Sequence, residues 1–232
     1  MTPLLGLFDV DGTLFVTHDP VSSEALLPAL RELYSVNPPA DAVERVDHAG
    51  QTSLRIAREV LRAEGLADGA IDEQLDNWCS LFARRYLELL ESADTTGWRA
   101  PPQAAVALSR LSEAGIQLAL LTGNPEPMAR ARMEQLGLER FFRLGQGAFG
   151  CDAEKRSALV GIARERAGGW PAHRTVEIGD TPHDVRSAHD AGVRSIVVRS
   201  PRGDDAFRDA DAICDDLSAA ADVLLAWNRQ PG

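Results

Sequence analysis

Residues 4–14 read LLGLFDVDGTL, an apolar run of strand length that stops abruptly in polar residues. The run from Leu4 to Phe8 has the length and the unbroken apolar character of a short buried strand. Asp9 and Asp11 follow one residue apart, and Gly12 allows the backbone to turn directly after them. The stretch therefore predicts a buried strand with two carboxylates at its carboxyl end.

The spacing of the two acids indicates chemistry. Alternate residues of an extended chain point the same way, so Asp9 and Asp11 can face one pocket at the end of the strand, where open α/β sheets bind ligands. Two carboxylates in one pocket repel each other unless a cation lies between them or one keeps its proton. The pair predicts a divalent metal, an acid–base role, or both. The alternative is a plain acidic turn, since Asp-Gly is a common turn sequence.

Composition limits the class of protein and its partners. The chain has 232 residues, 44% hydrophobic and 25% charged, which predicts a soluble globular protein with a core of ordinary size. A net charge of −11 argues against nucleic acid or an anionic membrane as a partner. We expect a monomer or a homodimer that binds a small molecule, and a small anionic substrate would need local positive charge or a metal.

Cysteine usage and the lack of targeting patterns predict a cytoplasmic location. The three cysteines, Cys79, Cys151 and Cys214, are scattered and form no CxxC pair, which favours packed free thiols in a reducing compartment. No signal-peptide pattern precedes the first strand, and no apolar run approaches the ~20 residues of a membrane helix.

Residues 22–92 carry helical patterns only. Apolar spacings of three and four predict a helix after Ser22 or Ser23, a second that begins at Thr52 or Ser53, and a long one over 71–90, with a short helix over 40–46. So long a helical stretch between two segments of α/β character predicts an inserted domain. We place this insertion at residues 16–97, and the other domain at residues 1–15 and 98–232.

The remainder of the chain alternates between strand and helix patterns. Continuous apolar strands that alternate with helices predict an α/β fold, a doubly wound parallel sheet of the Rossmann-like kind. The predicted strands are 4–8, 116–121, 141–144, 175–178, 194–198 and 212–214, and the predicted helices are 103–114, 126–136, 153–167, 184–191 and 217–227.

Several of these strands end in polar residues. Thr122 follows the strand 116–121, and Asp180 follows the strand 175–178. The carboxyl ends of parallel strands lie at one sheet edge, so these side chains can share a pocket with Asp9 although they are far apart in sequence. Asp184 lies one helical turn after Asp180 and can point to the same place. Carboxylate oxygens of this kind suit Mg²⁺.

The same edge carries candidate ligands for an anion. Thr122 and the turn amides of Gly123 and Asn124 stand at a helix amino terminus and can donate hydrogen bonds to a phosphate. Lys155 is the only lysine of the chain, and Arg156 follows it. Either cation could balance the acids and hold a phosphate oxygen, and the sequence leaves this choice open.

Four motifs together carry a family resemblance. They are FDVDGT at residues 8–13, LTGN at 121–124, the basic pair at 155–156 and GDTPHDV at 179–185. In this order, and with a helical insertion directly after the first, the chain resembles the haloacid dehalogenase-like hydrolases over essentially its whole length. The insertion is similar to the helical cap of phosphoglycolate-phosphatase-like members.

The resemblance implies a role for each matched residue. Asp9 is implied to be the nucleophile that takes the phosphoryl group, and Asp11 the acid and base. Asp9, the Asp11 carbonyl and Asp180 are implied to bind Mg²⁺, with Asp184 behind them. Thr122, together with Lys155 or Arg156, is implied to hold the phosphoryl oxygens. These expectations describe a Mg²⁺-dependent phosphatase that acts on a small phosphorylated metabolite.

Departures from the family pattern keep other activities in view. The third motif has Lys155-Arg156 where many capped members carry Lys-Pro, and Val16 stands where an acidic residue is common, which weakens a close match to phosphoglycolate phosphatase itself. A phosphosugar mutase would carry a histidine at the position of Val21, and a dehalogenase would lack Asp11. Phosphatase therefore fits best, with a mutase or a dehalogenase-type hydrolase as the alternative.

Overall fold

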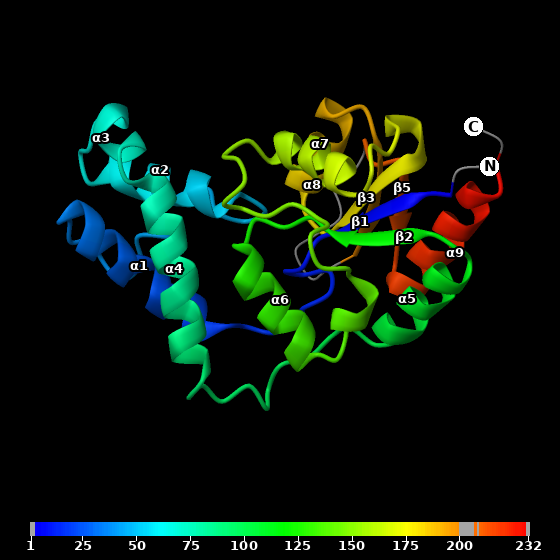
Figure 1. Ribbon diagram of the computed structural model, residues 1–232, viewed down its shortest axis with the longest axis horizontal. Coiled ribbons are helices and arrows are strands. Elements are labelled where there is room, and N and C mark those ends of the chain that lie inside the picture. Colours follow the sequence, from blue (N-terminus) through cyan, green and yellow to red (C-terminus); the bar gives the residue numbers. More distant parts are fainter. Residues whose placement is uncertain (1–2, 200–206, 208, 231–232) are drawn as a thin grey trace.

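A computed structural model of the chain describes residues 3–199, 207 and 209–230. Among these residues five strands form one parallel sheet in the order β2-β1-β3-β4-β5 (Figure 1). The strands are β1 (Leu5–Phe8), β2 (Gln117–Leu120), β3 (Thr175–Gly179), β4 (Arg194–Val198) and β5 (Ala212–Cys214). Because β1 lies between β2 and β3, the residues that follow it emerge between two other strand ends. The predicted α/β parallel-sheet fold is confirmed.

The alternation of side chains along β1 explains why helices cover both faces of the sheet. Leu5 and Leu7 point to the face covered by α7 (Arg156–Arg166) and α8 (Pro182–Asp190). Phe8 belongs to the core on the other face, which is covered by α5 (Ala104–Glu113) and α9 (Leu217–Asn228). Figure 1 shows these two helical layers on opposite sides of the strands. A strand that is buried on both faces needs a continuous apolar run, as the sequence has here.

The insertion between β1 and β2 is helical, as predicted. It contains α1 (Pro20–Tyr34), α2 (Ser53–Ala63), α3 (Asp68–Asp72) and α4 (Leu75–Leu90), which lie to one side of the sheet in Figure 1. The side chain of Asp19 caps α1 by accepting a hydrogen bond from the Val21 amide at 3.0 Å. Helices α1 and α4 pack against each other over an apolar core that includes Leu30, Trp78 and Phe82. The arrangement is consistent with a cap, and the domain boundaries stay a prediction.

The amino terminus of α2 is docked on the loops that follow the sheet. The Ser53 amide donates to the carbonyl of Gly123 at 2.8 Å, and the Leu54 amide donates to the carbonyl of Gly150 at 3.3 Å. A Cβ at Gly150 would lie 1.6 Å from the Gly123 carbonyl oxygen, so this close approach requires glycine there. The insertion therefore touches the edge of the sheet at which the polar residues gather. Helix α6 (Glu126–Gln135) lies between α4 and the sheet (Figure 1).

Three predicted elements differ in the structure. The strand over 141–144 is absent: a short 3-10 helix (Glu139–Phe141) leads into a loop in which Leu144 is 83% exposed, and Ala148 pairs with Leu121 instead. Phe142 anchors this loop by packing edge-on against Phe8.

The other two differences lie within the insertion. Residues 40–46 form turns rather than a helix: their backbone hydrogen bonds mix three- and four-residue spacings and do not form the consecutive ladder of an α-helix. The long helix over 71–90 is broken at Gln74, whose φ of −127° and ψ of 1° are not helical, and it becomes α3 and α4.

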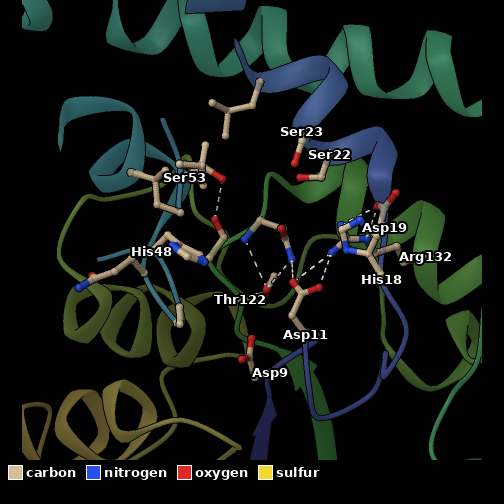
Figure 2. A pocket seen from close by; sticks show the side chains of 18 of the residues that line it. Asp9, Asp11, His18, Asp19, Ser22, Ser23, His48, Ser53, Thr122 and Arg132 are labelled. Atoms are coloured by element: carbon tan, nitrogen blue, oxygen red, sulfur yellow. Dashed lines mark hydrogen bonds and ion pairs between the residues drawn. The ribbon is translucent and has the colours of Figure 1, made fainter. Parts of the chain in front are cut away.

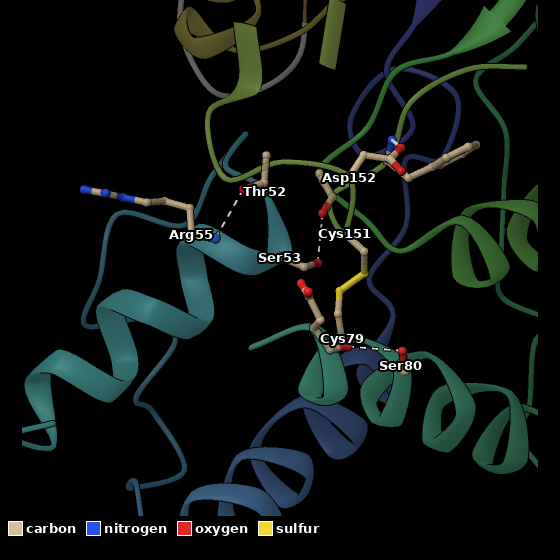
Figure 3. The surroundings of a disulfide bond; sticks show 10 residues. Thr52, Ser53, Arg55, Cys79, Ser80, Cys151 and Asp152 are labelled. Atoms are coloured by element: carbon tan, nitrogen blue, oxygen red, sulfur yellow. Dashed lines mark hydrogen bonds between the residues drawn. A yellow bond between two sulfur atoms is a disulfide. The ribbon is translucent and has the colours of Figure 1, made fainter. Parts of the chain in front are cut away.

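The prediction of three free thiols is wrong. Cys79 on α4 and Cys151 in the loop before α7 form a disulfide across 72 residues, which links the insertion to the rest of the chain (Figure 3). Cys214 is the free thiol and is buried. The pairing arises from tertiary contact, because Cys79 and Cys151 are far apart in sequence and follow no local motif. It also removes the cysteine argument for a reducing compartment, so the cytoplasmic location stays a prediction without that support.

Candidate active site

The ends of β1, β2 and β3 bring the predicted site residues together. Phe8 lies opposite Leu120 on one side and Ile178 on the other, so the next residues of all three strands meet at one edge. The Asp9 amide donates to the Ile178 carbonyl at 2.8 Å, which fixes the first residue after β1. Asp9, Thr122 and Asp180 are all buried there, with 3% or less of each residue exposed.

Asp9, Asp180 and Asp184 form a buried cluster of carboxylates. One oxygen from each lies within 4.8 Å of the others. Gly12 makes this approach possible: its φ is +83°, and a Cβ there would lie 2.1 Å from Asp180 Oδ2. Hard oxygen ligands around a common point fit Mg²⁺, and three buried acids need a cation between them. The Asp11 side chain lies outside this cluster, so only its carbonyl remains available as the predicted ligand.

Asp184 is held in place by its neighbours. Its Oδ2 accepts hydrogen bonds from the Thr181 amide at 2.8 Å and from the Thr181 hydroxyl at 2.7 Å, forming a capping box at the start of α8. Its Oδ1 is paired with the guanidinium of Arg156. Since both oxygens have protein partners, Asp184 is suited to orient the site from behind Asp9 and Asp180.

Burial raises the pKa of Asp9 to about 8 in the absence of a metal. The positive charge of Arg156 opposes this rise, whereas Asp184, Asp180 and Asp11 add to it. A cation bound among the acids would favour the ionised carboxylate that a nucleophile requires.

The structure directs Arg156, and not Lys155, into the site. Arg156 is buried, with Nη2 at 3.4 Å from Asp9 Oδ1 and Nη1 donating to the Gly50 carbonyl at 3.0 Å. Burial disfavours its charge, but Asp184, Asp9 and Glu177 outweigh that effect and hold the pKa of Arg156 above its ordinary value. The Lys155 side chain is 75% exposed and faces Asp190 at 3.5 Å.

Asp11 is held above Asp9 by residues of α6 and of the loop between β2 and α6 (Figure 2). Asn124 donates from Nδ2 to Asp11 Oδ2 and, at 3.1 Å, to the Thr122 hydroxyl. Arg132 Nη1 lies 2.8 Å from Asp11 Oδ1 and 3.0 Å from Oδ2. Thr122 and Asn124, two of the predicted anion ligands, thus lie beside the predicted acid. Gly123 lines the same cavity, and its carbonyl is occupied by Ser53.

Sequence reasoning missed a buried network that joins Asp11 to the insertion. Arg132 on α6 also binds Asp19 Oδ2, at 3.1 Å from Nε and 2.7 Å from Nη2. The Tyr86 hydroxyl on α4 donates to the same oxygen at 2.9 Å. The signal for Arg132 is its position on the apolar face of α6, three and four residues after the buried Ala129 and Met128, whereas the other arginine of the helix, Arg130, is only partly buried.

Glu177 was missed as well, although the sequence carries a signal for it. It is a lone acid in the apolar strand β3, fully buried, and a charge there needs a partner. The Ser187 hydroxyl donates to Glu177 Oε1 at 2.6 Å, and Arg156 Nε lies 3.6 Å from the same oxygen. Glu177 therefore supports Arg156 from below the site.

The loop before α2 both caps that helix and lines the cavity. Thr52 caps α2, since its hydroxyl accepts from the Arg55 amide at 3.2 Å. His48, Gly50 and Gln51 line the cavity above Asp9, where the loop contacts the core. This cavity has a volume of about 580 Å³ and lies between the sheet edge and α1, α2 and α4, within the range of small-ligand sites.

Comparison with known proteins agrees with this geometry. The family model of the haloacid dehalogenase-like hydrolases matches residues 7–192. A phosphoglycolate phosphatase of Rhodospirillum rubrum is 31% identical over 96% of this chain and 91% of its own length. The tyrosine-protein kinase PtkA of Mycobacterium tuberculosis is 29% identical over 85% of this chain and 62% of its own.

Solved structures agree on the fold. A crystal structure of CbbY from Rhodobacter sphaeroides in complex with phosphate aligns with a TM-score of 0.63 at 18% identity, covering 94% of this chain and 96% of that one. At this identity the likeness concerns the fold alone.

Among the helices of the described residues, none is long and apolar enough to cross a membrane.

Proposed function

The chain belongs to the haloacid dehalogenase-like hydrolases, and from that premise we propose that it hydrolyses a small phosphomonoester through an aspartyl-phosphate on Asp9. The observation that carries the proposal is the buried cluster of Asp9, Asp180 and Asp184 with Arg156 against it. Relatives with the same family domain include phosphoglycolate phosphatases, which supports phosphoric monoester hydrolysis as the reaction class.

Asp9 attacks phosphorus in the first half-reaction. A carboxylate oxygen of Asp9 forms a bond to phosphorus, and the bond between phosphorus and the substrate's alkoxyl oxygen breaks. Asp11 donates its proton to that leaving oxygen, so the product departs as a neutral alcohol. Asn124 and Arg132 hold the Asp11 carboxyl group above Asp9, a position that supports proton transfer between Asp11 and the leaving oxygen.

Water completes the cycle in the second half-reaction. Asp11, now ionised, accepts a proton from a water molecule whose oxygen attacks phosphorus, and the bond to Asp9 breaks to release inorganic phosphate. Arg156 and Thr122 offer hydrogen bonds to the phosphoryl oxygens through both steps. The insertion covers the site and excludes bulk water.

The donor set of Asp9, Asp180 and the Asp11 carbonyl suits Mg²⁺, with Asp184 as an orienting neighbour. Bound there, the ion would neutralise charge on the transferring phosphoryl group.

Hydrolysis of p-nitrophenyl phosphate tests the proposal. We expect Mg²⁺-dependent turnover that is lost in EDTA and in Asp9→Asn. A matched control is Asp215→Asn, because the Asp215 side chain is 89% exposed and does not line the cavity. Mass spectrometry of the acid-quenched protein should find a phosphoryl adduct on wild type and none on Asp9→Asn. Turnover that survives in Asp9→Asn would reject the mechanism.

A second assay tests whether Arg156 or Lys155 binds the phosphoryl oxygens. We expect Arg156→Gln to lower kcat by about 10²–10³-fold, the usual effect of removing one preorganised donor. Lys155→Gln should leave kcat unchanged, since the Lys155 side chain points to Asp190 in solvent. The opposite ranking would assign the role to Lys155. Scoring free phosphate separately from isomerised product distinguishes a phosphatase from the mutase alternative.

A further inference from the structure

We propose that the alcohol released by this enzyme carries no negative charge: the leaving group is neutral or cationic, with hydroxyl and apolar parts. This inference rests on the proposed function and names the substrate class of the same site. Its basis is the charge distribution of the cavity above Asp9, where the part of the substrate beyond phosphorus must lie.

The cavity contains four acids and two permanent cations among its described lining residues. The cations are Arg132 and Arg156, and the acids are Asp9, Asp11, Asp19 and Glu44. Arg156 stands at the phosphoryl end, where it already binds Asp184, Asp9 and the Gly50 carbonyl. A divalent ion would compensate the charge of the phosphoryl dianion and nothing more, so a further anionic group on the substrate would lie in a region of excess negative charge.

Arg132 is the only other permanent cation of the described lining, and it already binds two carboxyl groups, of which the buried Asp19 needs its charge. Its guanidinium binds Asp11 through Nη1 at 2.8 Å and Asp19 through Nη2 at 2.7 Å. The Arg132 and Asp19 side chains are each only 3% exposed. The hydroxyl of Tyr86, on α4 of the insertion, donates to Asp19 as well. A substrate carboxylate could reach Arg132 only by displacing a buried acid and leaving that acid without its cation, which is strongly unfavourable.

Away from Arg132 and Arg156 the cavity offers hydroxyl, apolar and imidazole groups in place of permanent cations. The imidazoles are those of His18 and His48. Ser22 and Ser23 on α1 face the space above Asp11, as Figure 2 shows. Leu26 and Phe82 line the wall between α1 and α4. Glu44 adds an exposed acid at the rim. This lining suits an alcohol with hydroxyl and hydrocarbon parts, or one bearing an ammonium group.

Three two-carbon phosphate esters whose terminal groups are neutral, cationic and anionic test the inference. They are 2-hydroxyethyl phosphate, O-phosphoethanolamine and 2-phosphoglycolate, assayed with the wild-type enzyme and Mg²⁺ by release of inorganic phosphate. We expect kcat/KM for the neutral and ammonium esters to exceed that for the carboxylate by about tenfold or more. A carboxylate ester that is hydrolysed equally well or better overturns the inference.

An aryl ester, p-nitrophenyl phosphate, distinguishes failure of the inference about charge from failure of the proposed function. Turnover of p-nitrophenyl phosphate with a preference for 2-phosphoglycolate would overturn only the inference about charge. No turnover of any ester, p-nitrophenyl phosphate included, would overturn the proposed function, and the inference with it.

A charge reversal at the cavity rim supplies a second test. Glu44→Lys places a cation beside the leaving group, so we expect the preference for the neutral ester over 2-phosphoglycolate to shrink by about threefold or more. The matched control is Glu24→Lys, because Glu24 is exposed on α1 but does not line the cavity. Equal ratios in both variants would overturn the inference.

Discussion

Replacing Arg132 with Met should cost both stability and leaving-group chemistry. Methionine retains the apolar bulk of the side chain between the rings of Phe15 and Tyr86, whose centroids lie 5.0 and 5.8 Å from the guanidinium carbon. The lost charge leaves Asp19, a 3% exposed carboxylate, buried without a cation. Breaking a buried pair by removing one partner costs about 3–5 kcal/mol.

The contacts that Asp19 keeps set the expected loss in the free energy of unfolding within this range. Asp19 retains two hydrogen bonds, from the Val21 amide at 3.0 Å and the Tyr86 hydroxyl at 2.9 Å. We therefore expect a loss of about 3 kcal/mol in the free energy of unfolding, at the lower end of that range. Adding Asp19→Asn, which removes the stranded charge, should recover part of the loss, because the two residues share one interaction.

Urea denaturation followed by circular dichroism measures this loss. The matched control is Arg110→Met: Arg110 pairs with Asp222 at the surface, where such a pair contributes about 0–1 kcal/mol. The kinetic part of the prediction concerns Asp11, which Arg132 positions as the proposed acid. Turnover of an alkyl phosphate should fall more than that of p-nitrophenyl phosphate, whose leaving group needs no proton.

Two results would contradict these roles of Arg132. A change below about 1 kcal/mol in Arg132→Met would show that the buried network contributes no more than a surface pair. Equal losses of turnover on the alkyl and aryl esters would show that Arg132 does not position an acid.

Three further outcomes are expected. Burial raises the pKa of Asp9 to about 8, so in the metal-free protein the contribution of Asp9 to the free energy of unfolding is most favourable below the unfolded pKa of 3.8 and is lost as pH rises toward 8. Mg²⁺ should therefore raise the melting temperature more at pH 8 than at pH 5, and equal shifts would contradict the assignment. Gly150→Ala should lower the free energy of unfolding because its Cβ would meet a backbone carbonyl, whereas Gly161→Ala, in open space on α7, should raise it by about 0.5–1 kcal/mol in denaturant titrations. Thiol titration of the denatured, unreduced protein should find one thiol, and titration after reduction should find three. Three thiols before reduction would refute the pairing. Joint substitution of Cys79 and Cys151 by serine should lower the free energy of unfolding by about 2–4 kcal/mol.

The sequence was sufficient for the fold and for the residues that follow the strands. Continuous apolar runs between helical patterns predicted a parallel sheet, and strands of that kind end at one edge. The convergence of Asp9, Thr122 and Asp180 was therefore predictable from local pattern alone. The strand over 141–144 was mispredicted because an apolar run also arises where a loop is anchored by one buried ring, here Phe142.

Only the tertiary structure selected among residues with equivalent local patterns. Lys155 and Arg156 are adjacent at the start of α7, and the buried acids Glu177 and Asp184 determine which of them turns inward. The ion pair of Arg132 with Asp19 spans 113 residues, and the disulfide spans 72. Such partners are set by how helices pack, which periodicity does not encode, because a buried charge or thiol finds its partner in space and not along the chain.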